Sequence, residues 1–157
     1  MSSESRDGKS WRPRGFGAIA AGMAALAVAM PTAASAKAEK GPTEIVVTNY
    51  PAAARESYKA FAAKCARCHT ITRAIVADHV LPSQWETAVE RMMKKWFSGI
   101  NKAMAKQIMD FLIYDSSIRK KPLLEAALAK LSPEARKAAE DRIAEIRLRY
   151  EQAPPAP

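Results

Sequence analysis

Both cysteines of this 157-residue chain lie in one pentapeptide, CARCH, which runs from Cys65 to His69. It matches the C-x-x-C-H pattern of covalent c-type haem attachment. Two thiols about one helical turn apart can each add to a vinyl group of the same porphyrin, and the histidine that follows then becomes the proximal iron ligand. A small domain that carries haem in this way builds much of its core around the group, so the motif constrains the fold as well as the chemistry.

Three other uses of the two cysteines are weaker. A disulfide across so short a loop would remove little entropy from the unfolded chain. A thioredoxin-like redox pair would require a βαβ context, whereas the patterns in this chain are almost entirely helical. A zinc site would need further ligands, and only His69 and His79 are present as histidines.

The first 36 residues predict a signal peptide. Four basic residues precede an apolar run from Gly15 to Met30, and small residues at Ala34 and Ala36 follow, so cleavage after Ala36 fits best. An uncleaved membrane anchor is the alternative, but this run of 16 residues is shorter than the roughly 20 that a helix needs to span a bilayer. We therefore expect a periplasmic protein.

The charge of the chain favours acidic partners. The whole chain has a formal charge of +9, and residues 37–157 keep 21 basic and 14 acidic residues, a formal charge of +7. This balance favours encounter with acidic protein surfaces or anionic lipid, so association with a membrane complex is one expectation. Basic and acidic residues alternate instead of forming one basic run, so nucleic acid is not expected as a partner. A small-molecule substrate is not expected either.

Apolar periodicity predicts a helical domain after a linker over residues 37–50, which contains one short extended piece. One helix is expected from Ala52 to Cys68, and a loop with a turn of helix follows it. A second helix is expected to start at Ser83 and Glu86, a capping-box pair, and to stop at Gly99. On that helix one face would carry Trp85, Val89, Met92 and Trp96.

A third helix is predicted to start with Asn101 as its cap and to end at Lys120 to Pro122. Its apolar face would carry Met104, Ile108, Phe111 and Leu112. A further helix after Ser132 carries a narrow apolar stripe of Ala139, Ile143, Ile146 and Tyr150, which predicts that it needs a partner surface. The predicted divisions are a signal peptide (1–36), a linker (37–50), a haem domain (51–120), a helical extension (121–151) and a disordered tail (152–157).

Residues Ala52 to Tyr114 resemble the monohaem c-type cytochromes of the bacterial class I kind. The resemblance rests on CARCH and, less specifically, on the segments CHTITRA, QWETAVERM and AKQIMDFL. It implies an all-α fold, a small cytochrome c-like helical domain around one covalent haem c. In such a fold the first and last helices of the core pack together and one haem edge lies near solvent. Cys65 and Cys68 would form the thioethers, and His69 would bind the iron as the proximal ligand.

The distal iron ligand is less constrained by the sequence, because the usual distal methionine of this family comes later, in a loop. Met92 is favoured, since it shares a predicted helix face with Trp85 and Val89, and Met93 is the fallback. His79, Met104 and Met109 are the other candidates. For Met104 and Met109 packing in the core is the simpler role, and for His79 an exposed position in a loop is simpler.

The resulting expectation is an exported electron-transfer protein, not an enzyme, with His/Met ligation. A haem-bearing subunit of a larger redox complex and a haem enzyme or gas sensor with an open sixth position are the alternatives. Trp85 and Trp96 are expected chiefly as apolar residues that close the pocket. The basic residues near the motif would either form a solvated face or ring an exposed haem edge; they are Lys64, Arg67, Arg73, Lys94 and Lys95.

Overall fold

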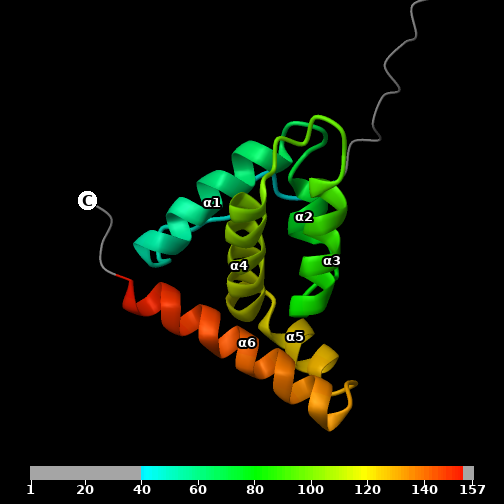
Figure 1. Cartoon of the computed structure of the whole chain (residues 1–157). Helices are drawn as coiled ribbons and strands as arrows, with labels where there is room; N and C mark the ends of the chain where they lie inside the picture. Colours follow the sequence, from blue (N-terminus) through cyan, green and yellow to red (C-terminus); the bar gives the residue numbers. More distant parts are fainter. Residues whose placement is uncertain (1–39, 154–157) are drawn as a thin grey trace, which may run out of the picture. The chain divides into compact units, whose positions relative to one another are not determined.

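The described part of the chain, residues 40–153 of a computed structural model, is entirely helical and contains no strand (Figure 1). The predicted all-α class is confirmed. The helices are α1 (Ala52–Cys65), α2 (Thr72–Val76), α3 (Pro82–Met93), α4 (Lys102–Arg119), α5 (Lys121–Leu128) and α6 (Pro133–Gln152). The predicted signal peptide and residues 154–157 of the predicted tail lie outside the described residues.

Helix α4 forms the centre of the core, since α1, α3, α5 and α6 all pack against it (Figure 1). Its side chains Ile108, Phe111 and Ile113 are completely buried. Phe111 stacks on Phe61 of α1 with ring centroids 5.5 Å apart, and Tyr58 of α1 lies 5.5 Å from the same ring. The helix that leads into the cysteine motif is therefore fixed to the centre of the domain by aromatic packing.

Two predicted helix starts are confirmed at their caps. The Asn101 side chain accepts a hydrogen bond from the backbone N–H of Met104 at 2.9 Å, and the Ser132 hydroxyl accepts one from Ala135. Both side chains satisfy backbone donors that the first turn of a helix leaves unpaired. The predicted stop at Lys120 is also correct, because α4 ends at Arg119.

The predicted capping box of α3 is wrong. The helix starts at Pro82, and its N-cap is Leu81, two residues before the predicted cap Ser83. Gln84 supplies the side-chain acceptor instead, since its Oε1 atom accepts hydrogen bonds from the backbone N–H groups of Val80 and Leu81 at 2.9 and 3.0 Å. In a capping box the side chain at the third helical position accepts from the backbone at the N-cap, and Gln84 makes this contact without a serine at the cap.

The ends of α1 and α3 also differ from the prediction. Helix α1 ends at Cys65, so Cys68 lies in the turn that follows. Helix α3 ends at Met93, and the Ser98 hydroxyl donates a hydrogen bond to the carbonyl of Met93, one of the carbonyls that a helix end leaves unpaired. The prediction that Trp96 shares the buried face of Trp85 is therefore wrong, since Trp96 lies beyond the helix and is 82% exposed.

The stripe of α6 faces the core of the same chain. Ile143, Ile146 and Tyr150 are buried, and the ring of Tyr150 meets that of Tyr114 on α4 edge to face at 5.1 Å. Helix α4 of the same chain supplies a surface for this stripe, and association of α6 with a partner or a second copy stays a prediction. The face that carries the stripe is consequently covered within this chain.

The segment before α1 also packs on the core. Ile45 and Tyr50 are buried, and the Tyr50 hydroxyl donates a hydrogen bond to Oδ1 of the buried Asp115 at 3.0 Å. Arg119 binds both oxygens of that carboxylate through its Nε atom, each at 3.1 Å. The carboxylate of α4 is thus satisfied by its own helix and by the chain that precedes α1.

Candidate functional site

The cysteine motif begins on the last residue of α1 and continues through the turn after it. Cys65 is half-buried, Cys68 is exposed, and both are free thiols. Burial of Cys65, with a smaller effect from the neighbouring Cys68, raises the pKa of the Cys65 thiol to about 11. Cys65 is therefore a protonated thiol at neutral pH, held against the core, while Cys68 is open to solvent.

His69 has the hydrogen bond that an iron-binding imidazole requires. Its Nδ1 atom lies 2.8 Å from the backbone carbonyl oxygen of Thr70. A carbonyl oxygen can only accept, so Nδ1 is the donor of this hydrogen bond. A histidine that binds a metal usually has its other ring nitrogen fixed by such a contact. The sequence contained no signal for Thr70 as this partner.

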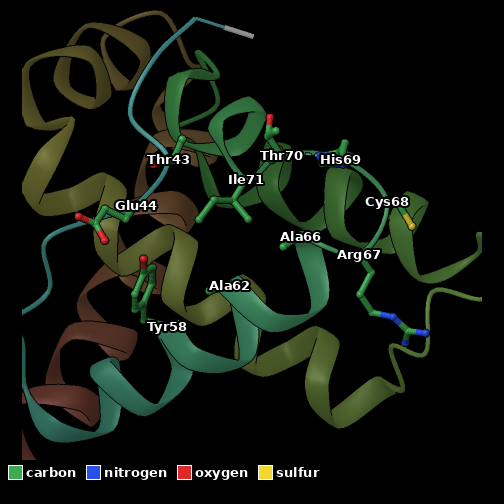
Figure 2. Close-up of a pocket in the computed structure, with 10 residues that line it drawn as sticks. All are labelled: Thr43, Glu44, Tyr58, Ala62, Ala66, Arg67, Cys68, His69, Thr70 and Ile71. Carbon is green, nitrogen blue, oxygen red and sulfur yellow. Dashed lines mark hydrogen bonds between the residues drawn. The ribbon is translucent and has the colours of Figure 1, made fainter. Parts of the chain in front are cut away.

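An open hollow of about 680 Å³ lies beside the motif (Figure 2). Tyr58 and Ala62 line it from α1, and the turn after α1 together with Thr43 and Glu44 forms the rest of its wall. The full lining is Thr43, Glu44, Tyr58, Ala62, Ala66, Arg67, Cys68, His69, Thr70 and Ile71. Tyr58 lies within the first predicted helix, whereas Thr43 and Glu44 carried no recognisable signal.

The connection between α3 and α4 also lies against the motif, at Arg67. Gly99 has a φ of +61°, and a Cβ atom at this position would lie 2.7 Å from Nη1 of Arg67. Lys64 approaches the same point, with its Nζ atom at 3.8 Å. The left-handed backbone favours glycine here, whereas the guanidinium lies at the end of a flexible side chain and can shift to admit a Cβ atom.

The methionines proposed as iron ligands are all half-buried. Met92 and Met93 end α3, Met104 and Met109 belong to α4, and all four pack against the hydrophobic core. The ten residues that line the hollow include no methionine. The structure thus brings Cys68 and His69 together at the hollow, and the choice of a distal ligand stays a prediction.

His79 and Trp85 form a separate group. The ring of His79 is half-buried and lies 5.4 Å from that of Trp85. Trp85 is buried, its Nε1 atom donates a hydrogen bond to Ser116 Oγ at 2.9 Å, and Lys120 Nζ lies 5.3 Å from the ring centroid. These contacts give Trp85 a role in joining α3 to α4.

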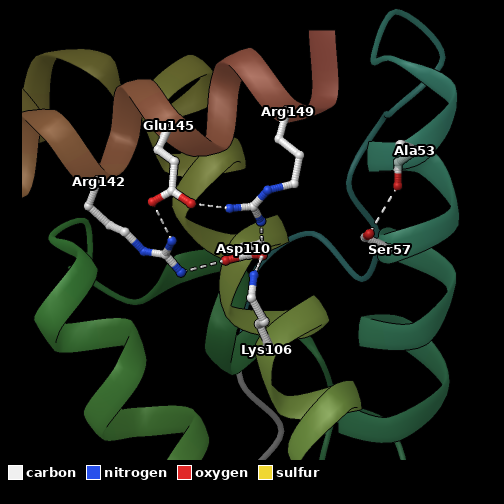
Figure 3. Close-up of polar contacts among 7 residues, drawn as sticks. All are labelled: Ala53, Ser57, Lys106, Asp110, Arg142, Glu145 and Arg149. Carbon is white, nitrogen blue, oxygen red and sulfur yellow. Dashed lines mark hydrogen bonds and ion pairs between the residues drawn. The ribbon is translucent and has the colours of Figure 1, made fainter. Parts of the chain in front are cut away.

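A buried carboxylate elsewhere in the fold is the centre of a second polar cluster. Asp110 of α4 is bound by three cations, Lys106 at 2.6 Å, Arg142 at 2.9 Å and Arg149 at 2.5 Å (Figure 3). Glu145 binds the same two arginines of α6. Every charge in this cluster has a partner within the chain, so the cluster joins α6 to α4.

The basic residues near the motif lie mostly on the surface. Arg67, Arg73, Lys94 and Lys95 are exposed, and Lys64 is half-buried. Among residues 40–153 no three side chains of His, Cys, Asp or Glu gather as a metal-binding group, and none of the helices there is long and apolar enough to cross a membrane. No family model, curated protein or solved structure matches this chain.

Proposed function

We propose that this chain is an exported monohaem c-type cytochrome that carries single electrons between protein partners. The observation that carries the proposal is the sequence Cys65 to His69 at the end of α1, together with the hydrogen bond from His69 Nδ1 to the Thr70 carbonyl. That bond leaves Nε2 as the ligand atom for iron. Bound haem would supply one-electron exchange between ferrous and ferric iron.

The chain's own residues would have distinct tasks. Cys65 and Cys68 would hold the porphyrin through thioether bonds, and His69 would bind the iron from the proximal side. Met92 is the proposed distal ligand, with Met93 as the fallback. A thioether ligand of this kind raises the reduction potential relative to a second histidine.

The proposed partner is a redox protein with an acidic docking surface. Arg67, Lys94 and Lys95 are exposed near the motif or at the end of α3, so they offer positive charge close to the proposed haem. Charges placed in this way accelerate encounter with an acidic surface, and the effect falls as salt screens it. The proposed location is the periplasm, after cleavage of residues 1–36 at Ala36.

Visible spectra of the haem-loaded protein test the proposed function. An electron carrier with two protein ligands should be six-coordinate and low-spin in both oxidation states and should bind carbon monoxide slowly. A high-spin spectrum with rapid carbon monoxide binding would contradict electron carriage and favour a haem enzyme or a gas sensor.

A further inference from the structure

The segment from Lys94 to Ile100, here called the aromatic turn, holds two large apolar side chains in the open. Trp96 is 82% exposed and Phe97 is 81% exposed, and their rings meet edge to face with centroids 5.4 Å apart. Aromatic rings are the side chains that gain most from burial, so two adjacent exposed rings indicate that something else covers them.

The aromatic turn is held in one conformation by hydrogen bonds. The Ser98 hydroxyl donates to the Met93 carbonyl at 3.0 Å, the Ser98 N–H donates to the Lys95 carbonyl at 3.1 Å, and the Ile100 N–H donates to Ser98 Oγ at 3.3 Å. Phe97 has a φ of 64°, a left-handed backbone that is strained for a bulky residue. The exposed rings are therefore presented by a built turn and not by a loose loop.

The aromatic turn lies beside the cysteine motif. Gly99 of the turn faces the guanidinium of Arg67, the third residue of CARCH, and the Nζ atom of Lys64 lies close to the same point. The turn also follows directly after Met92 and Met93, the residues proposed to reach the iron. The aromatic turn thus adjoins both the attachment motif, at Arg67, and the proposed distal ligands, Met92 and Met93.

We propose that the rings of Trp96 and Phe97 cover the apolar porphyrin of the attached haem, an inference that rests on the proposed function. A porphyrin held by Cys65 and Cys68 would present a broad apolar surface, and the two aromatic rings of the adjoining turn would supply apolar surface to cover it. The haem also carries two carboxylates, and Lys64, Arg67, Lys94 and Lys95 supply cations around the same turn. A lipid surface or a protein partner would use the rings but would not explain why the turn lies against the attachment motif.

Hydroxyl-radical footprinting of the exported full chain, read by peptide mass spectrometry, tests this inference. In haem-loaded protein Trp96 and Phe97 should lose most of their reactivity, whereas Leu148, an exposed residue of α6, should stay reactive. The Trp96→Ala/Phe97→Ala variant should still attach haem, and its reduction potential should fall because water reaches the group. Leu148→Ala should leave the potential unchanged.

The outcomes separate this inference from the proposed function. A chain whose mass lacks haem overturns both. Attached haem with fully reactive Trp96 and Phe97 overturns the inference alone. Protection that appears only with anionic vesicles, or only as the protein concentration rises, also overturns it, and assigns the rings to a membrane or to a second copy of the chain.

Discussion

Cys65 and Cys68 have different surroundings although only two residues separate them. Cys65 is the last residue of α1 and packs against the core, whereas Cys68 lies exposed in the turn at the edge of the hollow. The C-x-x-C-H pattern predicts that the two thiols attach haem. The difference in burial follows from the point at which α1 ends, which the pattern does not determine.

Met92 and Met93 allow a direct contrast at the scale of single residues. Met92→Ala should lower the reduction potential and remove the weak far-red absorption of the ferric protein, because it removes a thioether that favours ferrous iron. Met93→Ala should leave both nearly intact, since adjacent residues on a helix point about 100° apart and only one can readily face the iron. Spectroelectrochemistry measures both quantities.

The reverse pattern would assign the ligand to Met93. Unchanged spectra and potentials in both variants would refute ligation from the end of α3 and leave His79 and Met104 to be tested. A His79→Gln variant would then separate these two, because loss of a histidine ligand should raise the potential.

Lys120 should make stability depend on pH. Burial, aided by the adjacent Arg119, lowers the pKa of Lys120 from its ordinary 10.5 to about 8. Between these values the unfolded chain binds more protons at this site than the folded chain, so the contribution of Lys120 to the free energy of unfolding increases as pH rises through 8 towards 10.5. Solvent around the half-exposed side chain reduces the size of the effect.

Urea denaturation of the native chain and of Lys120→Met at about pH 7.5, 8.5 and 9.5 measures this contribution. The difference in the free energy of unfolding, native minus variant, should increase with pH, because the thioether side chain of the variant cannot titrate. The buried Tyr150, whose pKa burial raises to about 12, acts in the opposite direction at higher pH and cancels in the difference. A difference that is flat across this range would show that the pKa of Lys120 is not lowered.

Among the helices, α6 is joined to α4 by the cations around Asp110. Asp110→Asn should lower the free energy of unfolding by roughly 1–3 kcal/mol, because hydrogen bonds to a charged and buried acceptor are lost. Glu140→Gln is the matched control on α6, since it breaks an exposed pair with Arg136 and should cost less than about 1 kcal/mol. If urea denaturation shows the same loss of unfolding free energy for Asp110→Asn and Glu140→Gln, the proposed role of Asp110 in joining α6 to α4 is contradicted.

The apolar contact of α6 gives an independent test of the same junction. Ile146 is completely buried, so Ile146→Ala should lower the free energy of unfolding by roughly 2–5 kcal/mol. Leu148, two residues further along, is 55% exposed. Leu148→Ala should therefore change the free energy of unfolding by no more than about 0.5 kcal/mol. Loss of helical circular dichroism in denaturant measures both. A small effect of Ile146→Ala would mean that α6 folds without support from α4.

At the scale of the whole molecule, local signals in the sequence predicted most of the helices. Apolar spacing located the buried faces of α4 and α6, and the caps Asn101 and Ser132 marked two of the starts. These features depend on residues within a few positions of each other, so a single sequence contains them.

The failures of prediction depend on contacts that no local pattern encodes. Helix α3 ends at Met93, where Ser98 donates to the last carbonyl, and Trp96 beyond this end is exposed although the helical period would bury it. The acceptor for His69 is a neighbouring carbonyl whose direction follows from the backbone turn. At the site, the sequence predicted which residue types bear the chemistry. The hollow and the residues that line it could be identified only from the fold.

The intact mass of the exported protein tests the central proposal most directly. The chain should have the mass of residues 37–157 plus one haem, and the haem should stay attached in acid and denaturant, because thioether bonds do not break under these conditions. A Cys65→Ser/Cys68→Ser variant, exported in the same way, should lack the added mass. A native chain with the mass of the polypeptide alone, and with both thiols open to alkylation, would contradict the proposal.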